Sequence, residues 1–381
     1  GLNNVGNTCF LNVTLQCLAH TPALAQTLLH RLHSRRWFGG KGGKGGAGGP
    51  DQEGDLWVQM ELTVERMLGP RGGGGGSVTP QAILKRLQLI RRSLRVGRQE
   101  DAHEFLRCLL ESMHASELRH AGVLEKAALR RGLTSLVHGI FGGFFRSQTR
   151  CAACHANSNS FDSFLDVALD VGGGVPTVEE ALRRMTAPEY LDADNLYLCE
   201  RCGARSRARR QTAIRYPPNA LCLVLKRFAF SLPGGGSKIN AHVGFEETLD
   251  ISPFLSPEAV AEGQPSRYRL HSVLVHTGAT VHSGHYFSYV RSPSGAWMLM
   301  DDSSVRRCTS AEVKSQRAYI LFYSRESSTS PPILPAPGFK TKVLLQREDG
   351  EEEVGKRGVG EEREEEEKKK EVGKKSVEEE E

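Results

Sequence analysis

The chain of 381 residues lacks any long apolar run, although 39% of its residues are hydrophobic. A helix that crosses a membrane needs about 20 consecutive apolar residues, and no segment approaches that length. The first residues include no signal-like apolar region. The chain also lacks an initiator Met, so we expect it to begin inside a longer protein. Its hydrophobic content allows a sizeable core, in one large domain or two.

A disulfide framework is also missing. The number of cysteines is nine, which is odd, and four of them form two CxxC pairs: Cys151 with Cys154, and Cys199 with Cys202. This usage is typical of a reducing, intracellular compartment and of a metal site. Four thiolates make the tetrahedral sulfur set that zinc prefers, and no histidine joins them, so the zinc would be structural. Coincidental cysteines or a redox dithiol are the alternatives.

The formal net charge of +5 is unevenly distributed. From Glu348 to the end, 16 acidic residues oppose eight basic ones, so the preceding part carries a net charge of about +13. A basic body with an acidic tail favours a nuclear setting or contact with nucleic acid, and scattered solvated arginines are the alternative. The Arg-rich segments 91–98 and 205–210 lack the interleaved aromatic residues that would stack on bases.

Apolar residues recur at helical spacing in the first third of the chain and alternate as in strands after about Leu133. Helices before strands predict the α+β class. We expect helices from Cys9 to about Leu32, over Leu56–Leu68, behind Thr79 as N-cap with Pro80 at the first helical position, over Gln99–His114 and over Thr177–Met185. The expected strands are 164–171, 220–230, 271–276, 286–290, 297–300 and 319–323. Gly-rich segments at 39–50 and 72–76 predict flexible loops, and the Pro/Ser-rich then Glu/Lys-rich segment 327–381 predicts a disordered tail.

Cys9 follows a small polar segment, Gly6 to Thr8, and precedes the first apolar helix. The positive end of a helix favours a thiolate, which is the nucleophilic form of cysteine. The side-chain amide of Asn4 is placed to donate a hydrogen bond to an oxyanion formed at Cys9. A lone cysteine is often a buried, inert thiol. Downstream, however, His285 and then Asp301 supply a base and a carboxylate in the order of papain-like enzymes.

These segments resemble the ubiquitin-specific proteases. The resemblance spans Gly1 to about Arg325, with its motifs in the expected order. It rests on a cysteine box at Gly6–Asn12 followed by Leu15–Leu18, a histidine box from Tyr268 through Ser303, and three further matches at Gln99–Leu106, Leu225–Phe228 and Tyr319–Tyr323. The segment Phe161–Val167 is similar to that of a subgroup with nuclear and nucleolar members.

The resemblance implies a papain-like fold within 1–326, with a helical thumb over about 1–132 and a β-rich palm and zinc-bearing β fingers over about 133–326. It implies a deubiquitinating thiol protease that cleaves the isopeptide or peptide bond after the C-terminal glycine of ubiquitin through a thioester, without a catalytic cofactor. In this reading Cys9 is the nucleophile and His285 the base. Asp301 orients His285, Asn4 and the backbone N–H of Cys9 stabilise the oxyanion, and Asp302 supports that region.

Gln99, Asp101, Glu104 and Tyr286 are the substrate-binding residues that the resemblance implies. Asp101 and Glu104 are three positions apart, so we expect them to share a helix face and to meet the arginines before the terminal Gly-Gly of ubiquitin. An ordinary surface helix is the alternative reading of the same pattern.

The zinc implied at Cys151, Cys154, Cys199 and Cys202 lies at the tip of the fingers. Two other functions compete with the protease: an inactive ubiquitin-binding scaffold and a zinc-containing nucleic-acid-binding protein. The intact Cys9, His285, Asp301 and Asn4 favour the active enzyme. Ubiquitin and ubiquitinated proteins are the expected partners, and no membrane contact is expected. The subgroup likeness favours the nucleus, including the nucleolus, over the cytoplasm.

Overall fold

The computed structural model of the protein describes residues 1–39, 54–69, 76–122, 135–228, 238–280 and 283–326. They all belong to one structural unit, Gly1–Val343. The predicted tail 327–381 lies outside the described residues, as do the predicted Gly-rich loops apart from Gly39 and Gly76, so the boundary at residue 326 and those loops stay predictions. Among the described helices, none has the length and apolarity needed to cross a bilayer.

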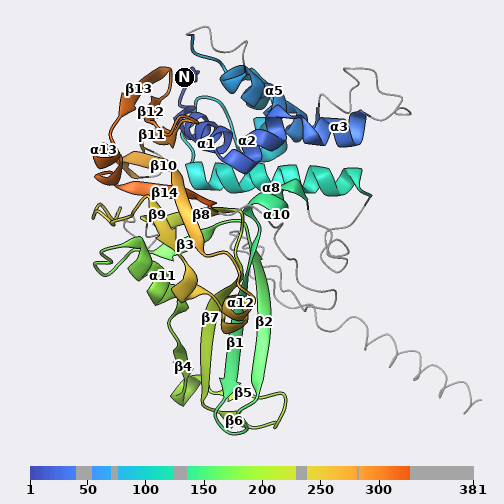
Figure 1. Cartoon of the computed structure of the whole chain (residues 1–381), viewed down its shortest axis with the longest axis vertical. Coiled ribbons are helices and arrows are strands. Elements are labelled where there is room, and N and C mark those ends of the chain that lie inside the picture. The colour runs from blue at the N-terminus through green and yellow to red at the C-terminus, as the bar shows by residue number, and fades with distance from the viewer. Residues whose placement is uncertain (40–53, 70–75, 123–134, 229–237, 281–282, 327–381) are drawn as a thin grey trace, which may run out of the picture. The chain divides into compact units, whose positions relative to one another are not determined.

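The N-terminal half is helical and gathers at one end of the unit in Figure 1. Its helices are α1 (Cys9–Ala19), α2 (Pro22–Leu29), α3 (Leu32–Phe38), α5 (Leu56–Leu68), α6 (Gln81–Leu84), α7 (Leu87–Ile90), α8 (Ala102–His120) and α10 (Leu136–Phe141). All residues of α1 are buried, because this helix packs between α8 and a strand of the large sheet. The helix that begins with Cys9 is therefore the centre of the helical half.

The longest helix, α8, begins where Asp101 caps it. The side chain of Asp101 accepts hydrogen bonds from the backbone N–H groups of His103 and Glu104, which have no partner inside the helix. Its buried face carries residues at a spacing of three or four: Ala102, Phe105, Leu106, Leu109, Leu110 and Met113. Burying one large apolar side chain contributes about 1.5–3 kcal/mol, so this face holds α8 in place.

The predicted length of one helix and the predicted start of another were wrong in detail. The predicted stretch from Cys9 to about Leu32 is broken after Ala19, because Pro22 opens a new helix and has no N–H to continue the first. Pro80 occupies the N-cap position of α6 and is not its first residue. Thr79 does not cap that helix; its hydroxyl accepts a hydrogen bond from Asn3 at 2.9 Å.

Strands form the rest of the unit. An eight-stranded sheet has the order β13-β12-β11-β10-β14-β8-β3, with β9 paired to β10, and a four-stranded sheet has the order β2-β1-β7-β4. The bounds are β1 (Gly143–Cys151), β2 (Asn157–Phe164), β3 (Val167–Asp170), β4 (Glu189–Leu191), β5 (Tyr197–Leu198), β6 (Arg205–Ser206), β7 (Ala208–Tyr216), β8 (Ala220–Lys226), β9 (Thr248–Asp250), β10 (Arg267–Thr280), β11 (Ser283–Arg291), β12 (Trp297–Asp301), β13 (Ser304–Cys308) and β14 (Ala318–Arg325). Short helices α11 (Val178–Thr186), α12 (Pro257–Ala261) and α13 (Ser310–Lys314) and the 3-10 turns η1 (Ala193–Asn195) and η2 (Ser252–Phe254) connect them.

The strand predicted over 164–171 is confirmed only as β3, with alternating burial over Val167–Asp170, because Phe164 belongs to β2 in the other sheet. The chain leaves the small sheet after Phe164 and enters the large sheet at Val167, where β3 pairs in parallel with β8. Figure 1 shows the long strands β1, β2 and β7 extending away from the helices, with the two-stranded β5–β6 sheet at their far end.

The large sheet is covered on both faces by apolar residues. Along β14, Ile320 and Phe322 join the core shared with the helices, whereas Leu321 and Tyr323 join a second core on the opposite face. Successive side chains of a strand point to opposite faces, so a strand buried on both sides is apolar throughout. The prediction of an α+β fold with a helical part, a β-rich part and β fingers is confirmed.

Candidate active site

Cys9 is the first residue of α1 and is 4% exposed. The N–H groups of the first helical turn have no partner inside the helix, so those of Cys9 and Phe10 are free to donate to an anion beside the thiol. The loop before Cys9 turns through Gly6, whose φ of 102° favours glycine. Gly97 N–H donates to the carbonyl of Gly6 at 3.0 Å, and Asn7 donates to the carbonyl of Gly97 at 2.9 Å. The loop is thereby fixed against the segment that precedes α8.

The large sheet brings His285 to this cysteine. His285 lies near the start of β11, and its Nε2 donates to Asp301 Oδ1 at 2.6 Å, at the end of β12. A hydrogen bond with the thiol of Cys9, together with the hydrogen bond and charge of Asp301, outweighs partial burial and raises the pKa of His285 from 6.5 to about 9. The imidazole is therefore protonated at neutral pH beside the cysteine, an arrangement that favours a thiolate–imidazolium pair.

Asp302 connects the turn after β12 to the loop before Cys9. Its carboxylate accepts hydrogen bonds from the side-chain amides of Asn4 at 2.9 Å and Asn12 at 2.8 Å, and its carbonyl accepts from Leu2 N–H at 2.8 Å. The backbone of Asp302 is left-handed, with a φ of 48°, which a small polar residue tolerates. The carboxylate is thus aimed at the two amides and holds Asn4 near Cys9.

The side-chain oxygen of Asn4 is also engaged. It accepts hydrogen bonds from the N–H groups of Gly6 at 3.2 Å and Thr8 at 3.1 Å. These contacts orient the amide, and its NH₂ group retains a second hydrogen for an oxyanion, because only one hydrogen is needed for Asp302. The orientation of Asn4 is therefore fixed by the loop that leads to Cys9, and its contact with an oxyanion stays a prediction.

The competing histidines are in different environments. Burial lowers the pKa of His271 to about 3, and burial followed by the charge of Lys238 lowers the pKa of His276 to about 4, so both are neutral. His276 is buried between the rings of Phe228 and Tyr286. His282 lies outside the described residues. Among His271, His276 and His285, which the structure describes, only His285 lies beside Cys9 and a carboxylate.

Four other cysteines lie outside the CxxC pairs. Burial raises the pKa of the thiols of Cys17, Cys108, Cys222 and Cys308, which keeps them protonated and unreactive.

Gln99 binds the backbone of β11, the strand that carries His285. The sequence predicted that Gln99 contacts the substrate and did not predict this contact. Its side-chain amide donates to the carbonyl of Gly284 at 3.0 Å and accepts from the N–H of Gly284 at 3.0 Å. Gly284 directly precedes His285, and a Cβ at this position would lie 2.1 Å from the carbonyl oxygen of Thr277. The two-way amide contact and the close approach of two strands therefore position the base.

Asp101 and Glu104 do not share a helix face as expected, and their contact with the arginines of ubiquitin stays a prediction. Asp101 precedes the helix and caps it, and its second oxygen accepts from the hydroxyl of Tyr319 at 2.7 Å. Glu104 forms an ion pair with Arg91. Tyr286 is 3% exposed and packs on His276, so this tyrosine does not present its ring to a substrate in this structure. The cap had a signal in the sequence, because an Asp three positions before a Glu, followed by apolar residues, is typical of a helix start.

Sequence analysis did not assign roles to Asn12 or Tyr319. Asn12 lies inside the cysteine box, but a buried asparagine gives no signal of its partner until Asp302 is placed beside it. Tyr319 begins the last predicted strand, and only the fold shows that its hydroxyl reaches Asp101.

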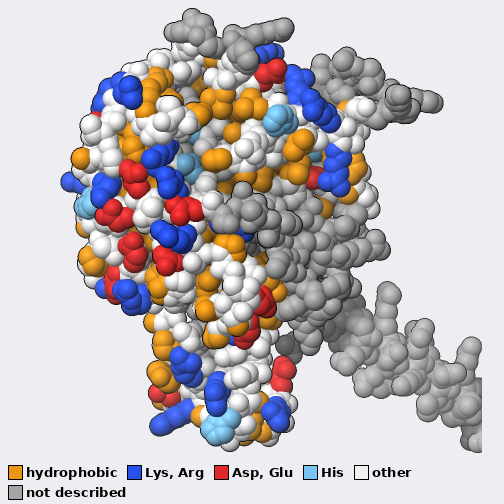
Figure 2. All heavy atoms as spheres, in the orientation of Figure 1, with side chains coloured by type: hydrophobic (Ala, Val, Ile, Leu, Met, Phe, Trp, Pro, Cys, Tyr) orange, Lys and Arg blue, Asp and Glu red, His pale blue; other side chains and the backbone are white. Residues whose placement is uncertain are grey.

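The four CxxC cysteines come together at the end of the β fingers, where Figure 2 shows basic and histidine side chains on the surface. Cys151 Sγ lies 4.0 Å from Cys202 Sγ, and Cys154 Sγ lies 3.7 Å from Cys199 Sγ. Zn–S bonds of about 2.3 Å at tetrahedral angles separate the sulfurs by about 3.8 Å. The two knuckles therefore have the spacing that one tetrahedral metal ion requires.

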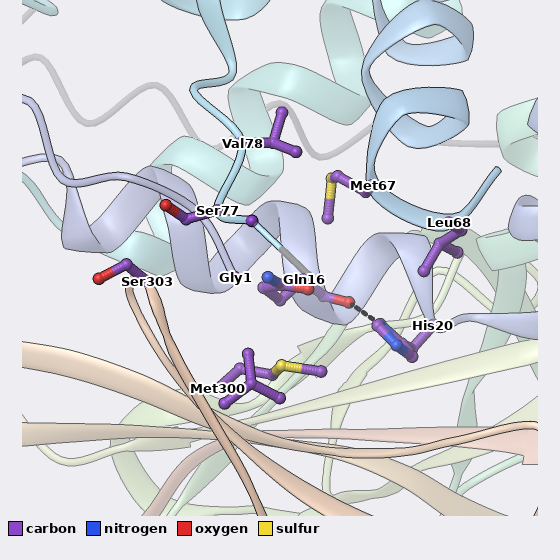
Figure 3. A pocket seen from close by; sticks show the side chains of 11 residues that line it. Gly1, Gln16, His20, Met67, Leu68, Ser77, Val78, Met300 and Ser303 are labelled. Carbon is purple, nitrogen blue, oxygen red and sulfur yellow. Dashed lines mark hydrogen bonds between the residues drawn. The ribbon is translucent and has the colours of Figure 1, made fainter. Parts of the chain in front are cut away.

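A pocket of about 400 Å³ lies beside the first residue, lined by side chains from α1, α5, β12 and β13. Figure 3 shows His20 at its edge, where the ring is held by the carbonyl of Gln16 at 2.8 Å. Burial lowers the pKa of His20. The pocket includes Ser303 but none of Cys9, His285 or Asp301, so it is separate from the candidate active site.

The geometry defines a papain-like cysteine hydrolase, since a helix presents the thiol and a neighbouring sheet presents the imidazole and its carboxylate. A family model described as ubiquitin carboxyl-terminal hydrolase matches residues 1–323. The chain belongs to this family, and the predicted likeness to ubiquitin-specific proteases is confirmed.

Among similar proteins is the mouse (Mus musculus) ubiquitin carboxyl-terminal hydrolase 17-like protein C, 37% identical over 348 residues, which are 91% of this chain and 58% of the relative. The human (Homo sapiens) ubiquitin carboxyl-terminal hydrolase 17-like protein 6 is 36% identical over 327 residues, covering 86% of this chain and 74% of the relative. The chain thus spans little more than half the length of the mouse relative.

Among solved structures, the SAGA Ubp8/Sgf11/Sus1/Sgf73 DUB module bound to ubiquitin aldehyde is similar, with a TM-score of 0.73 and 27% identity over 86% of this chain and 69% of that chain. The same module with a cysteine-to-alanine substitution in Ubp8, bound to monoubiquitin, has a TM-score of 0.71 and 27% identity, again over 86% of this chain and 69% of that chain.

Proposed function

We propose that this chain is a deubiquitinating cysteine protease that hydrolyses the bond after the C-terminal glycine of ubiquitin. The observation that carries the proposal is the convergence of Cys9, His285 and Asp301 at the start of α1. Family membership and the likeness to a module described as bound to ubiquitin aldehyde support ubiquitin as the substrate.

In this mechanism the thiolate of Cys9 attacks the glycine carbonyl, and the negative charge develops on its oxygen. The N–H of Cys9 and the amide of Asn4, held by Asp302, donate to that oxygen. The imidazolium of His285 protonates the leaving lysine amine, and the thioester of Cys9 remains. Neutral His285 then takes a proton from water, which hydrolyses the thioester and releases ubiquitin.

The competing proposal of an inactive ubiquitin-binding scaffold predicts binding without chemistry. The test is reaction with ubiquitin that carries a C-terminal electrophile, followed by mass spectrometry of the adduct. We expect one covalent ubiquitin on Cys9 in the wild type and none in Cys9→Ala, which should still bind ubiquitin non-covalently. Binding by the wild type with no covalent adduct would support the scaffold instead.

The four-cysteine cluster supports a structural zinc ion, which we propose for Cys151, Cys154, Cys199 and Cys202. All four donors come from protein, so the ion would tie β1 to the segment between β5 and β6 and would take no part in the hydrolysis. Contact with nucleic acid and a nuclear location stay predictions from the basic body and the subgroup likeness.

A further inference from the structure

A second group of metal-ligand residues lies in the helical half, away from the four cysteines. His33 on α3, Asp55 at the N-cap of α5 and His120 at the end of α8 place their donor atoms within 4.8 Å of one another. His33 Nε2 lies 3.4 Å from Asp55 Oδ1, and His120 Nε2 lies 2.8 Å from Asp55 Oδ2. The group joins three helices that are far apart in sequence.

Within the described part of the chain, the buried imidazole of His33 lacks the hydrogen bonds that a buried polar group normally makes. Its side chain is 0% exposed, and among the described residues neither ring nitrogen makes a hydrogen bond of good geometry, although Nε2 lies 3.4 Å from Asp55 Oδ1. The ring stacks on Trp57 with centroids 5.4 Å apart and planes 9° apart, which directs its edge at Asp55. A buried polar group without a partner costs about 1–3 kcal/mol, so an imidazole held in this way indicates a missing ligand.

The surroundings favour a cation. Glu61 and Glu117 are 1% and 3% exposed, and both lie close enough to His33 to interact with it electrostatically. Glu61 accepts a hydrogen bond from Ser34 N–H at 3.2 Å, and Glu117 accepts from Leu136 N–H at 2.7 Å. Burying several carboxylates together is unfavourable unless positive charge accompanies them. Arg36 supplies part of that charge from the surface, with its side chain 58% exposed and its guanidinium 3.8 Å from Glu117, and a bound cation would supply more.

We propose that His33, Asp55 and His120 bind a divalent transition-metal ion, with Zn²⁺ as the ion to test. Two imidazoles and one carboxylate are a donor set that zinc accepts, with a fourth position for water. Zinc bonds of about 2.0–2.1 Å at tetrahedral angles separate neighbouring donors by about 3.3 Å. The distances of 3.4 and 2.8 Å from Asp55 to the two histidines lie on either side of this value. Such an ion would fasten α3 and α8 to the start of α5.

The experiment measures zinc per chain by mass spectrometry after the intact protein is equilibrated with Zn²⁺ and passed through a desalting column. The key variant is His120→Gln, because glutamine can still donate a hydrogen bond to Asp55 but removes the imidazole ligand. His30→Ala is the matched control, since His30 is an exposed histidine of the same helical half. Cys202→Ser separates this ion from the one proposed at the four cysteines.

We expect two zinc ions in the wild type and in His30→Ala, and one in His120→Gln and in Cys202→Ser. After replacement by Co²⁺, His120→Gln should keep the intense thiolate-to-cobalt absorption and Cys202→Ser should lose it. Zinc should raise the melting temperature of Cys202→Ser but not that of a variant with both substitutions. One ion in the wild type that disappears only with Cys202→Ser would overturn the proposal, as would two ions in His120→Gln.

Discussion

The charge of Asp301 should set the alkaline limit of activity. The imidazolium of His285 must protonate the leaving amine, so activity should fall as pH rises through its pKa of about 9. Asp301→Asn removes the charge that favours the imidazolium but leaves a side chain of the same shape. The alkaline limb of kcat/KM should therefore move to lower pH.

The contacts of His285 set the expected size of the shift in the alkaline limb of kcat/KM. Cys9 is the larger cause of the increase from 6.5 to about 9, and Asp301 is the second source that raises the pKa. The side chains of His285 and Asp301 are 40% and 45% exposed, so solvent screens their interaction. We therefore expect Asp301 to contribute about one unit to the raised pKa of His285. The alkaline limb of kcat/KM for Asp301→Asn should then lie near pH ~8.

The assay is the pH profile of kcat/KM on a ubiquitin–lysine isopeptide conjugate, in which the amine must be protonated to leave. Asp302→Asn is the matched control, because Asp302 is bound to Asn4 and Asn12 and has no hydrogen bond to His285. It should lower the rate at every pH and move the limb less than Asp301→Asn does, because a carboxylate oxygen of Asp302 lies within 4.8 Å of a ring nitrogen of His285 but accepts its hydrogen bonds from Asn4 and Asn12. An unmoved limb in Asp301→Asn, or an equal shift in both variants, would refute the assignment of Asp301 as the orienting carboxylate.

Three further predictions concern the residues that support the site. Gly284→Ala should reduce kcat at least about 100-fold with ubiquitin binding retained, because its Cβ would meet the backbone of Thr277 and displace His285; near-normal turnover would contradict this. Gln99→Ala should lower kcat more than it raises KM, since its amide holds Gly284 and not the substrate; a change in KM alone would restore the substrate-binding role. Cys154→Ser should lose the fingertip zinc and lower the melting temperature of the β fingers, and an unchanged zinc content would exclude the four-cysteine site.

Most of the candidate catalytic and metal-binding residues could be predicted, because each lies in a short segment with a recognisable sequence pattern. Cys9 precedes an apolar helix, His285 follows a glycine in a strand, and the CxxC pairs are recognisable by spacing alone. Contacts between distant segments could not be predicted in this way. The two-way amide contact of Gln99 with Gly284 depends on where the segment before α8 meets β11, and the separation of β2 from β3 depends on pairing with different sheets. Such contacts are set by the tertiary fold, and the local sequence pattern does not predict them.

The acidic pair before α8 shows how such a tertiary contact changes a functional argument. Asp101→Ala would remove a helix cap worth about 0.5–2 kcal/mol and leave the hydroxyl of Tyr319 without its acceptor, so a loss of activity could come from the helix alone. Asp101→Asn keeps one oxygen for the cap, and its NH₂ group can donate to the oxygen of Tyr319, so the charge is removed while both contacts can persist. If Asp101 recognises the arginines of ubiquitin, Asp101→Asn should raise KM by about 30-fold or more while the melting temperature changes little. An unchanged KM on full-length ubiquitin would assign Asp101 to the helix cap only, and Glu104, already paired with Arg91, would then be a surface residue.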